Sequence, residues 1–324
     1  MGEYRELWHD HQESWLKTCT YPHNQDKNGV VVKASHSLIS LGTERLVTSE
    51  MLTEELGQEM SIPHMKGNFS SQFTYGYSLV GNVIAGPQKI IGKHVHLLHP
   101  HQEMAFVHHS EISLIPEGMS PYVATLASNM ETAVNANWDA EISVGDHVLI
   151  IGYGIIGALV ASLVIKYPGV KLTILELDDL RAKKARKNGF MVVRSKDELD
   201  SEFDIAFNAS ASESGLQAAI DKTISEGKIV ELSWYGSKKV TLDLGNAFHH
   251  GRKRIISSQV GSIPFSKQPG WTFEKRKMLV FDLLKQPEMN ELLKNEITFS
   301  EAPDFYKKLR KGEINEFSTV INYK

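Results

Sequence analysis

The sequence has one cysteine, Cys19, in 324 residues, so the chain can form no internal disulfide and cannot supply the four thiolates of a structural zinc site. It has no apolar run of membrane-spanning length, and its polar N-terminus contains acids, unlike a secretory leader. The formal net charge of −4 gives no excess of positive charge that would attract nucleic acid. We therefore expect a cytoplasmic enzyme or binding protein, with no membrane and no nucleic-acid partner.

The apolar pattern changes twice along the chain. Residues 1–120 contain short strand-like runs separated by glycine and proline, which is typical of a small antiparallel barrel or sandwich. Residues 121–264 alternate apolar strands with helical segments, which predicts a parallel, doubly wound sheet. Residues 265–324 return to short elements, and we expect this tail to fold back on the first region. The predicted fold class is therefore α/β, with a parallel-sheet domain at 121–264 and an antiparallel barrel or sandwich made from 1–120 and 265–324.

A glycine-rich motif lies between a strand and a helix of the middle region. It reads Gly152-Tyr153-Gly154-Ile155-Ile156-Gly157, after the apolar run 147–151 and before a long apolar segment. In such a motif Gly152 permits a tight turn, Gly154 lets the backbone approach a pyrophosphate, and Gly157 lets the helix pack on the strand. The backbone N–H groups of Ile155 and Ile156 then open the helix, where phosphates bind. The motif predicts a dinucleotide site.

The next apolar strand ends at Glu176, about two dozen residues after Gly152, where an acid is expected to bind the adenosine ribose. A carboxylate there repels a 2′-phosphate, so we expect NAD in preference to NADP. Arg181 is the competing feature, because an arginine nearby can bind a 2′-phosphate.

Two later strands of the same region also end in small or polar residues. Ala209 and Ser210 follow one strand and leave room for the adenosine half of a dinucleotide, and Leu232 and Ser233 follow the next. Ligands of doubly wound sheets bind at these strand ends. We place Leu232 and Ser233 beside the nicotinamide, and the expected cofactor contacts also include Val260.

A short polar stretch, Ser40-Leu41-Gly42-Thr43-Glu44, interrupts the first strand-like region. Such a stretch holds a metal, takes part in catalysis or only turns the chain, and the residues alone leave all three open.

Four stretches, SLISLGTE, YGYSLVGNV, NMETAVNANWDA and VELSWYG, stand in this order around the glycine motif. Together they resemble the medium-chain dehydrogenase/reductase superfamily, which contains the zinc alcohol dehydrogenases and quinone oxidoreductases. They look most like a bacterial branch related to bacteriochlorophyllide dehydrogenases. The resemblance covers nearly the whole chain and implies a GroES-like barrel domain, a Rossmann domain, an interdomain cleft with the nicotinamide at its base, and a homodimer. It also implies that Asn129 and Thr132 contact the nicotinamide.

The zinc ligands of that family do not carry over to this chain. Zinc members have a cysteine where Ser40 stands, a His-Glu pair where Tyr77 and Ser78 follow Gly76, and a third ligand near Ala127. Zinc is bound by thiolate, imidazole or carboxylate groups. We therefore predict that the protein holds no catalytic and no structural zinc.

Without zinc, other groups must stabilise the negative charge that develops on a carbonyl oxygen during hydride transfer. Tyr77 is our first candidate for this donor, with Thr43 and Ser40 as relay or oxyanion donors. Glu44 and Glu131 are candidate general acids, although Glu44 can equally cap a turn and Glu131 can equally cap or bridge a helix.

These features predict a zinc-independent, NAD(P)-dependent oxidoreductase of the medium-chain type. It would transfer hydride between nicotinamide and a small-molecule substrate, a carbonyl, an alcohol or an activated C=C compound, whose identity the sequence does not give. The alternative is a non-catalytic NAD(P)-binding sensor or scaffold.

Overall fold

The computed structural model describes residues 2–22, 28–49, 52–200, 202–314 and 316–324. The chain divides into two compact units, one formed by residues 1–128 and 281–324 and the other by residues 129–280. Each unit has its own sheets and its own core, and we describe each by itself.

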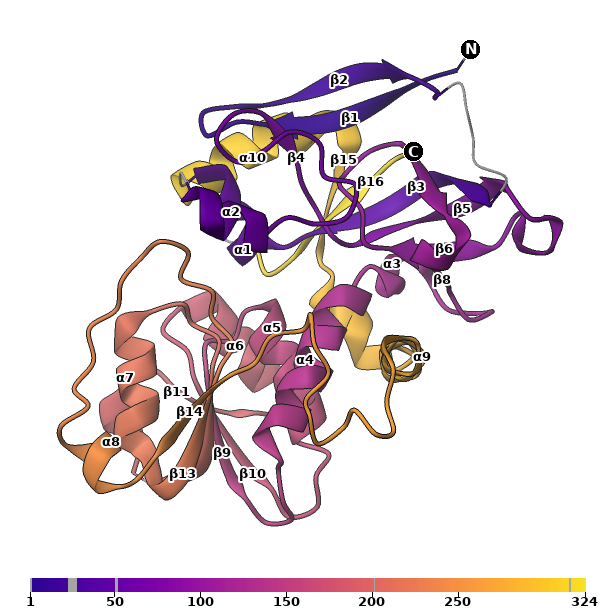
Figure 1. The fold of residues 1–324 in the computed structure, drawn as a ribbon. Coiled ribbons are helices and arrows are strands. Elements are labelled where there is room, and N and C mark those ends of the chain that lie inside the picture. Colours follow the sequence, from indigo (N-terminus) through magenta and orange to yellow (C-terminus); the bar gives the residue numbers. More distant parts are fainter. Residues whose placement is uncertain (1, 23–27, 50–51, 201, 315) are drawn as a thin grey trace. The chain divides into compact units, whose positions relative to one another are not determined.

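The second unit is built on a six-stranded parallel sheet with the strand order β11-β10-β9-β12-β13-β14 (Figure 1). Its strands are β9 (His147–Ile151), β10 (Lys171–Leu175), β11 (Met191–Val193), β12 (Phe203–Asn208), β13 (Thr223–Glu231) and β14 (Arg254–Ser257). The chain starts in the middle, winds outward to β11 and then crosses to β12, which is the order of doubly wound dinucleotide-binding sheets. All four strands that the apolar runs predicted in this region are present.

Helices cover both faces of this sheet, with α7 on one side and α4 on the other (Figure 1). They are α4 (Ala127–Ala140), α5 (Ile155–Val164), α6 (Asp179–Lys187), α7 (Glu213–Lys222), α8 (Ala247–His250) and α9 (Phe273–Leu284), with the 3-10 turn η3 (Lys196–Glu198). Buried Leu149 and Phe203 of the sheet pack against Leu216 and Ile220 of α7. The strands are apolar on both faces because helices bury both of them.

The first unit contains two mostly antiparallel sheets. A three-stranded sheet has the order β2-β1-β4, and a seven-stranded sheet has the order β15-β16-β3-β5-β6-β8 with β7 paired to β3. The strands are β1 (Glu3–His9), β2 (Ser14–Thr20), β3 (Gly29–Ile39), β4 (Phe73–Thr74), β5 (Leu79–Ala85), β6 (His94–Leu97), β7 (Met104–His108), β8 (Ile112–Leu114), β15 (Asn295–Thr298) and β16 (Thr319–Asn322). The antiparallel pairing of β16 with β3 confirms that the tail folds back on the first region.

The helices of the first unit are short. They are α1 (Leu41–Ser49), α2 (Glu54–Glu59), α3 (Pro121–Ala124) and α10 (Ala302–Lys311), with the 3-10 turns η1 (Gln88–Ile90), η2 (His109–Glu111), η4 (Pro287–Leu292) and η5 (Phe299–Glu301). The buried face of α10, with Phe305, Tyr306 and Leu309, packs on Leu7 and Ile39 of the strands. These two units confirm the predicted fold class, a doubly wound parallel sheet together with a separate antiparallel region.

The boundaries between the units, after residues 128 and 280, lie later in the chain than the 120 and 264 that the sequence suggested. Helix α3 contacts β3 and β5, so residues 121–124 stay with the first unit. The segment after β14 is tied to α4 by Arg276 of α9, which binds both Asn135 and the carbonyl of Val260. The second unit therefore extends into α9.

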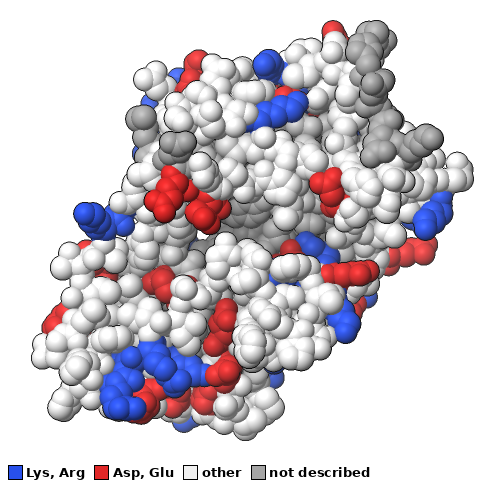
Figure 2. All heavy atoms as spheres, in the orientation of Figure 1, with Lys and Arg blue, Asp and Glu red and all other residues white. Residues whose placement is uncertain are grey.

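Charged side chains of both signs are spread over the face that Figure 2 shows, with one compact group of basic side chains on the parallel-sheet unit. Within the described ranges, no helix combines the length and the apolar character needed to cross a bilayer.

Candidate functional site

The glycine motif forms a tight turn between β9 and α5. Gly152 has φ +91°, and a Cβ atom there would lie 2.9 Å from the Ala209 carbonyl oxygen. A Cβ atom on Gly157 would collide with the Gly152 carbonyl, so only a glycine at this position lets the helix approach the strand so closely. Gly154 is the N-cap of α5, and a Cβ there would meet only the Arg181 guanidinium, at 3.9 Å. The space beside Gly154 is therefore open at the end of a ten-residue helix, the arrangement that accepts a pyrophosphate.

Glu176 lies directly beside this turn. Its carboxylate accepts a hydrogen bond from the Tyr153 backbone N–H at 2.6 Å and one from the Asp178 N–H at 2.8 Å, and the residue is 7% exposed. The acid thus supports the turn itself while it places negative charge at the end of β10. Arg181 also lies at this turn, with its Nη1 3.9 Å from the place that a Cβ on Gly154 would take. Both features that bear on the cofactor's 2′ position therefore border the same turn.

The carboxyl ends of β12 and β13 are joined by a polar network. Buried Asn208 donates to Glu231 at 2.8 Å and to the Tyr235 hydroxyl at 3.1 Å, and its Oδ1 accepts from Ser210 Oγ at 2.7 Å. Burial and the Glu231 charge raise the pKa of Tyr235 to about 12. Sequence reasoning named Ser210 but missed Asn208, Glu231 and Tyr235. The signal was available, since Asn208 and Glu231 each end a predicted strand.

Ser233 connects the same two strand ends. Its hydroxyl accepts a hydrogen bond from the Ala211 N–H at 2.9 Å, and the Leu232 N–H donates to the Asn208 carbonyl at 2.9 Å. Ala211 has φ +51°, a left-handed conformation that alanine rarely adopts. Ala209 pairs with the end of β9 through its N–H. The structure thus brings the predicted residues Ala209, Ser210, Leu232 and Ser233 to one edge of the sheet.

The remaining predicted cofactor residues lie on α4 and after β14. Asn129 is 1% exposed, and its Oδ1 is buried with no hydrogen-bond partner. Thr132 lies one turn further along α4. Val260 follows β14, and its carbonyl accepts from Arg276 at 2.9 Å. A buried amide oxygen without a partner is costly unless a ligand donates to it, which suits Asn129 as a cofactor contact.

Glu131 bridges two helices, which was the structural alternative to a role as general acid. It forms ion pairs with Lys277 at 2.5 Å and Arg276 at 3.4 Å, and all three side chains are largely buried. Glu131 therefore bridges α4 to α9.

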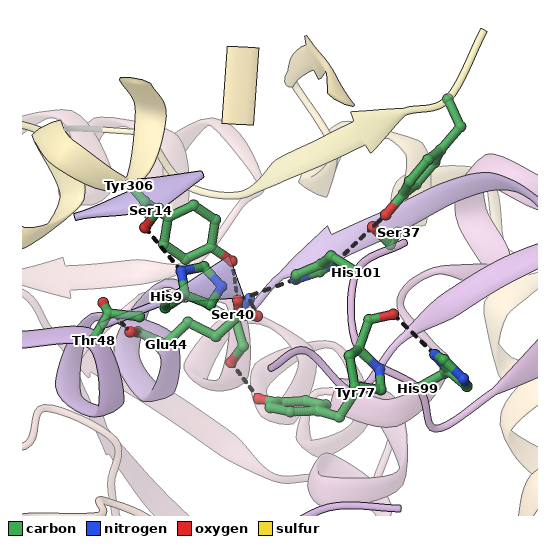
Figure 3. Close-up of polar contacts among 12 residues, drawn as sticks. His9, Ser14, Ser37, Ser40, Glu44, Thr48, Tyr77, His99, His101 and Tyr306 are labelled. Atoms are coloured by element: carbon green, nitrogen blue, oxygen red, sulfur yellow. Dashed lines mark hydrogen bonds and ion pairs between the residues drawn. The ribbon is translucent and has the colours of Figure 1, made fainter. Parts of the chain in front are cut away.

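The polar stretch of the first unit begins helix α1 instead of only turning the chain (Figure 3). The Tyr77 hydroxyl donates a short hydrogen bond to Ser40 Oγ, and the Thr43 hydroxyl also bonds with Tyr77. Gly76, with φ +120°, precedes Tyr77, and a Cβ there would lie 2.6 Å from the His101 ring. The structure therefore brings Ser40, Thr43 and Tyr77 together as a cluster of three hydroxyls. Burial and the nearby charge of Glu44 raise the pKa of Tyr77, against the opposing bonds from Ser40 and Thr43, so the phenol stays protonated.

Glu44 lies beneath this cluster with no exposed surface. It accepts hydrogen bonds from the Ser40 N–H at 2.7 Å, from His101 Nε2 at 3.1 Å, and from the Tyr306 hydroxyl (Figure 3). A carboxylate buried in this way touches no substrate, so its position supports the capping alternative over a general acid. His101 Nδ1 in turn bonds with Ser37 Oγ at 2.7 Å, and Ser37 bonds with the Tyr323 hydroxyl at 2.8 Å. Sequence reasoning did not foresee His101, Ser37, Tyr306 or Tyr323 beneath the cluster.

The positions of the family's zinc ligands do not fit a zinc ion in this chain. The hydroxyls of Ser40 and Tyr77 bond with each other, and Ala127 has no donor atom. Ser128, the next residue, donates to the Tyr77 carbonyl at 2.8 Å. Zinc sites in proteins use thiolate, imidazole or carboxylate ligands. Across the part of the chain that the structure describes, no group of three or more His, Cys, Asp or Glu side chains is placed to hold a metal.

A comparison with models of protein families finds none that matches the chain. The chain is 23% identical over 215 residues to a D-guloside 3-dehydrogenase of Shigella flexneri. The match covers 62% of this chain and 61% of the relative, so it spans about three fifths of the relative's length.

Two solved structures have the same fold over nearly their whole length. One is described as a zinc-binding dehydrogenase from Sinorhizobium meliloti 1021 bound to NADP, with a TM-score of 0.78, 14% identity and full coverage of both chains. The other is acetophenone reductase from Geotrichum candidum in complex with NAD, with a TM-score of 0.76 and 18% identity, covering 99% of this chain and 97% of that chain. At these identities the likeness shows the fold of the alcohol dehydrogenase type and no more.

Proposed function

We propose that the protein is a nicotinamide-dinucleotide-dependent oxidoreductase that acts without zinc. The observation that carries this proposal is the open position beside Gly154, at the N-terminus of α5, in a turn that the Glu176 carboxylate and the Arg181 guanidinium both border. The likeness of the fold to a dehydrogenase solved with NADP and to a reductase solved with NAD supports it.

The residues that would hold the cofactor lie at the carboxyl ends of the parallel strands. The backbone at Gly154, Ile155 and Ile156 would hold the pyrophosphate, and Glu176 the adenosine ribose. The orphaned Oδ1 of Asn129 would accept a hydrogen bond from the nicotinamide half. When bound, the nicotinamide ring gives or accepts the hydride.

In the first unit, the Tyr77 hydroxyl would turn its one O–H from Ser40 Oγ to the substrate oxygen and donate a hydrogen bond or proton there, and Ser40 Oγ would then donate to the phenol oxygen. Burial raises the pKa of its phenol, which keeps the donor protonated at neutral pH. Ser40 and Thr43 fix the hydroxyl from one side, and Glu44 holds Ser40 from below. Glu44 would thus act through Ser40, as a positioning residue.

We keep NAD as the proposed cofactor, because the charge of Glu176 next to the Tyr153 N–H repels a 2′-phosphate. The substrate we would test first is a sugar hydroxyl or the matching ketone, because the curated relative is a dehydrogenase of a D-guloside. A homodimer, a cytoplasmic location and the zinc-free branch related to bacteriochlorophyllide dehydrogenases belong to the proposal as well.

Titration of metal-free protein with NADH and with NADPH tests the cofactor assignment. We expect NADH to bind more tightly, and the Glu176→Gln variant to lose part of that preference. Tighter binding of NADPH would contradict our interpretation of Glu176 and would give Arg181 the deciding role. Metal analysis of the purified protein tests zinc independence. One stoichiometric zinc per chain that is lost when Tyr77 is substituted would overturn it. A sensor or scaffold, the alternative, would bind NADH without turnover.

A further inference from the structure

The segment after β14 is held by three hydrogen bonds to α4 and α9, all within the second unit. Ser258 Oγ donates to Asp139 Oδ2 at 2.6 Å, and Asn135 Nδ2 donates to the Gln259 carbonyl at 3.2 Å. The third bond runs from Arg276 Nη1 to the Val260 carbonyl at 2.9 Å. Three consecutive residues are therefore each fixed by a different side chain.

Arg276 also joins the two helices that hold this segment. The same Nη1 donates to Asn135 Oδ1 at 2.8 Å, and Nε donates to Glu131 Oε1 at 3.4 Å. The guanidinium lies 5.1 Å from the centre of the Phe273 ring, and the residue is 3% exposed. A planar guanidinium with fixed N–H directions can serve several acceptors at once, which a lysine cannot do in the same geometry.

The side chains of α4 that make these hydrogen bonds lie on one face of the helix. Glu131, Asn135 and Asp139 follow one another at intervals of four residues, so they share one helix face. The same helix carries Asn129 and Thr132, and the segment that it holds carries Val260. Asn129 and Thr132 are among the residues that we assign to the nicotinamide half of the cofactor site, and Val260 is a further expected cofactor contact.

From this arrangement we propose that Arg276 is a positioning residue that sets the nicotinamide half of the cofactor site by locking Val260 and α4 together. This inference rests on the proposed cofactor function. The inference goes beyond that function because it separates the two halves of the cofactor site. The adenosine half depends on the glycine turn and Glu176, and none of the three hydrogen bonds described for Arg276 reaches either of them.

The test compares NADH with ADP-ribose, which lacks the nicotinamide ring but keeps the adenosine and the pyrophosphate. We expect Arg276→Met to weaken NADH binding at least tenfold and to change ADP-ribose binding less than twofold, as measured by calorimetric titration. Arg276→Lys should recover only part of the NADH affinity. Equal weakening of both ligands, or no change in either, would overturn the proposal. If the wild-type protein binds neither ligand, the proposed function itself fails, and that result is distinct from the others.

Lys253→Met is the matched control. Lys253 is also a largely buried cation (8% exposed), and its Nζ donates to a backbone carbonyl, that of Ile220, at 2.6 Å. It lies just before β14, at the amino ends of the strands, away from the predicted site. We expect this variant to lose stability without changing the ratio of NADH to ADP-ribose affinity. Asn135→Ala, which removes the bond to Gln259 and one acceptor of Arg276, gives a second and milder variant in case Arg276→Met does not fold. We expect it to shift the same ratio in the same direction, and an unchanged ratio would count against the proposal.

Discussion

Removal of the Glu44 carboxylate should destabilise the first unit more than most single substitutions. The side chain has no exposed surface and accepts from the Ser40 N–H, His101 Nε2 and the Tyr306 hydroxyl. In Glu44→Ala all three donors lose their acceptor in a buried site. Each such orphaned donor costs about 1–3 kcal/mol, and part of this is recovered by relaxation, so we expect a total loss of about 4 kcal/mol.

The assay is differential scanning calorimetry at pH 7, where the transition of the first unit should fall by about 10 °C. Glu44→Gln is the informative partner variant. Its amide keeps an acceptor for the Ser40 N–H and has nearly the same shape, but it loses the charge and cannot accept from all three donors. We expect it to cost about 2 kcal/mol. A loss below about 0.5 kcal/mol for Glu44→Ala would refute the assignment of Glu44 as the acceptor that organises this core.

Three further predictions concern separate parts of the molecule. Burial holds the pKa of His99 at about 4, below its ordinary value of 6.5. As the pH drops, the unfolded chain therefore takes up a proton before the native protein does. The contribution of His99 to stability is fully present above about pH 6.5 and falls below it. Between pH 7 and pH 5 this loss in the free energy of unfolding is about 2 kcal/mol. The free energy of unfolding of His99→Gln, measured with urea, should lack that part of the pH dependence, and the same pH dependence in both proteins would contradict the prediction. Ala211→Gly should stabilise the second unit by up to about 1 kcal/mol, because it relieves the left-handed φ of +51°, and Ala211→Val should do the opposite. Tyr77→Phe should lower kcat by about a hundredfold with little change in NADH affinity, since it removes one donor to the substrate oxygen, and an unchanged kcat would assign that role to another group.

Periodicity predicted the parts of the fold that local sequence controls. The strands β9, β10, β12 and β13 were visible because buried parallel strands are apolar on both faces. The glycine turn could be predicted because local sterics require glycine at two of its positions. Gly152 has a positive φ, and Gly157 lies where the helix closely approaches the strand.

The sequence did not reveal the parts that depend on distant partners. Helix α1 begins at a polar stretch for which the sequence left three roles open, and Glu44 within it is bound by His101 and Tyr306, which are 57 and 262 positions away. The role of Arg276 likewise requires contacts with Glu131 and Asn135, more than a hundred residues earlier. No local pattern specifies such pairings, because they arise only once the strands and helices are packed.

The most direct test of dinucleotide binding at the glycine turn is an NADH titration of the wild-type protein and of Gly154→Val. The position beside Gly154 is open, so the variant should fold with a melting temperature close to that of the wild type. Gly157→Ala, whose Cβ would collide with the Gly152 carbonyl, should lose stability as well as binding. We predict that the wild type binds NADH and that Gly154→Val binds it at least a hundredfold more weakly. Failure of the wild type to bind NADH or NADPH, or equal affinity in the folded variant, would contradict the assignment.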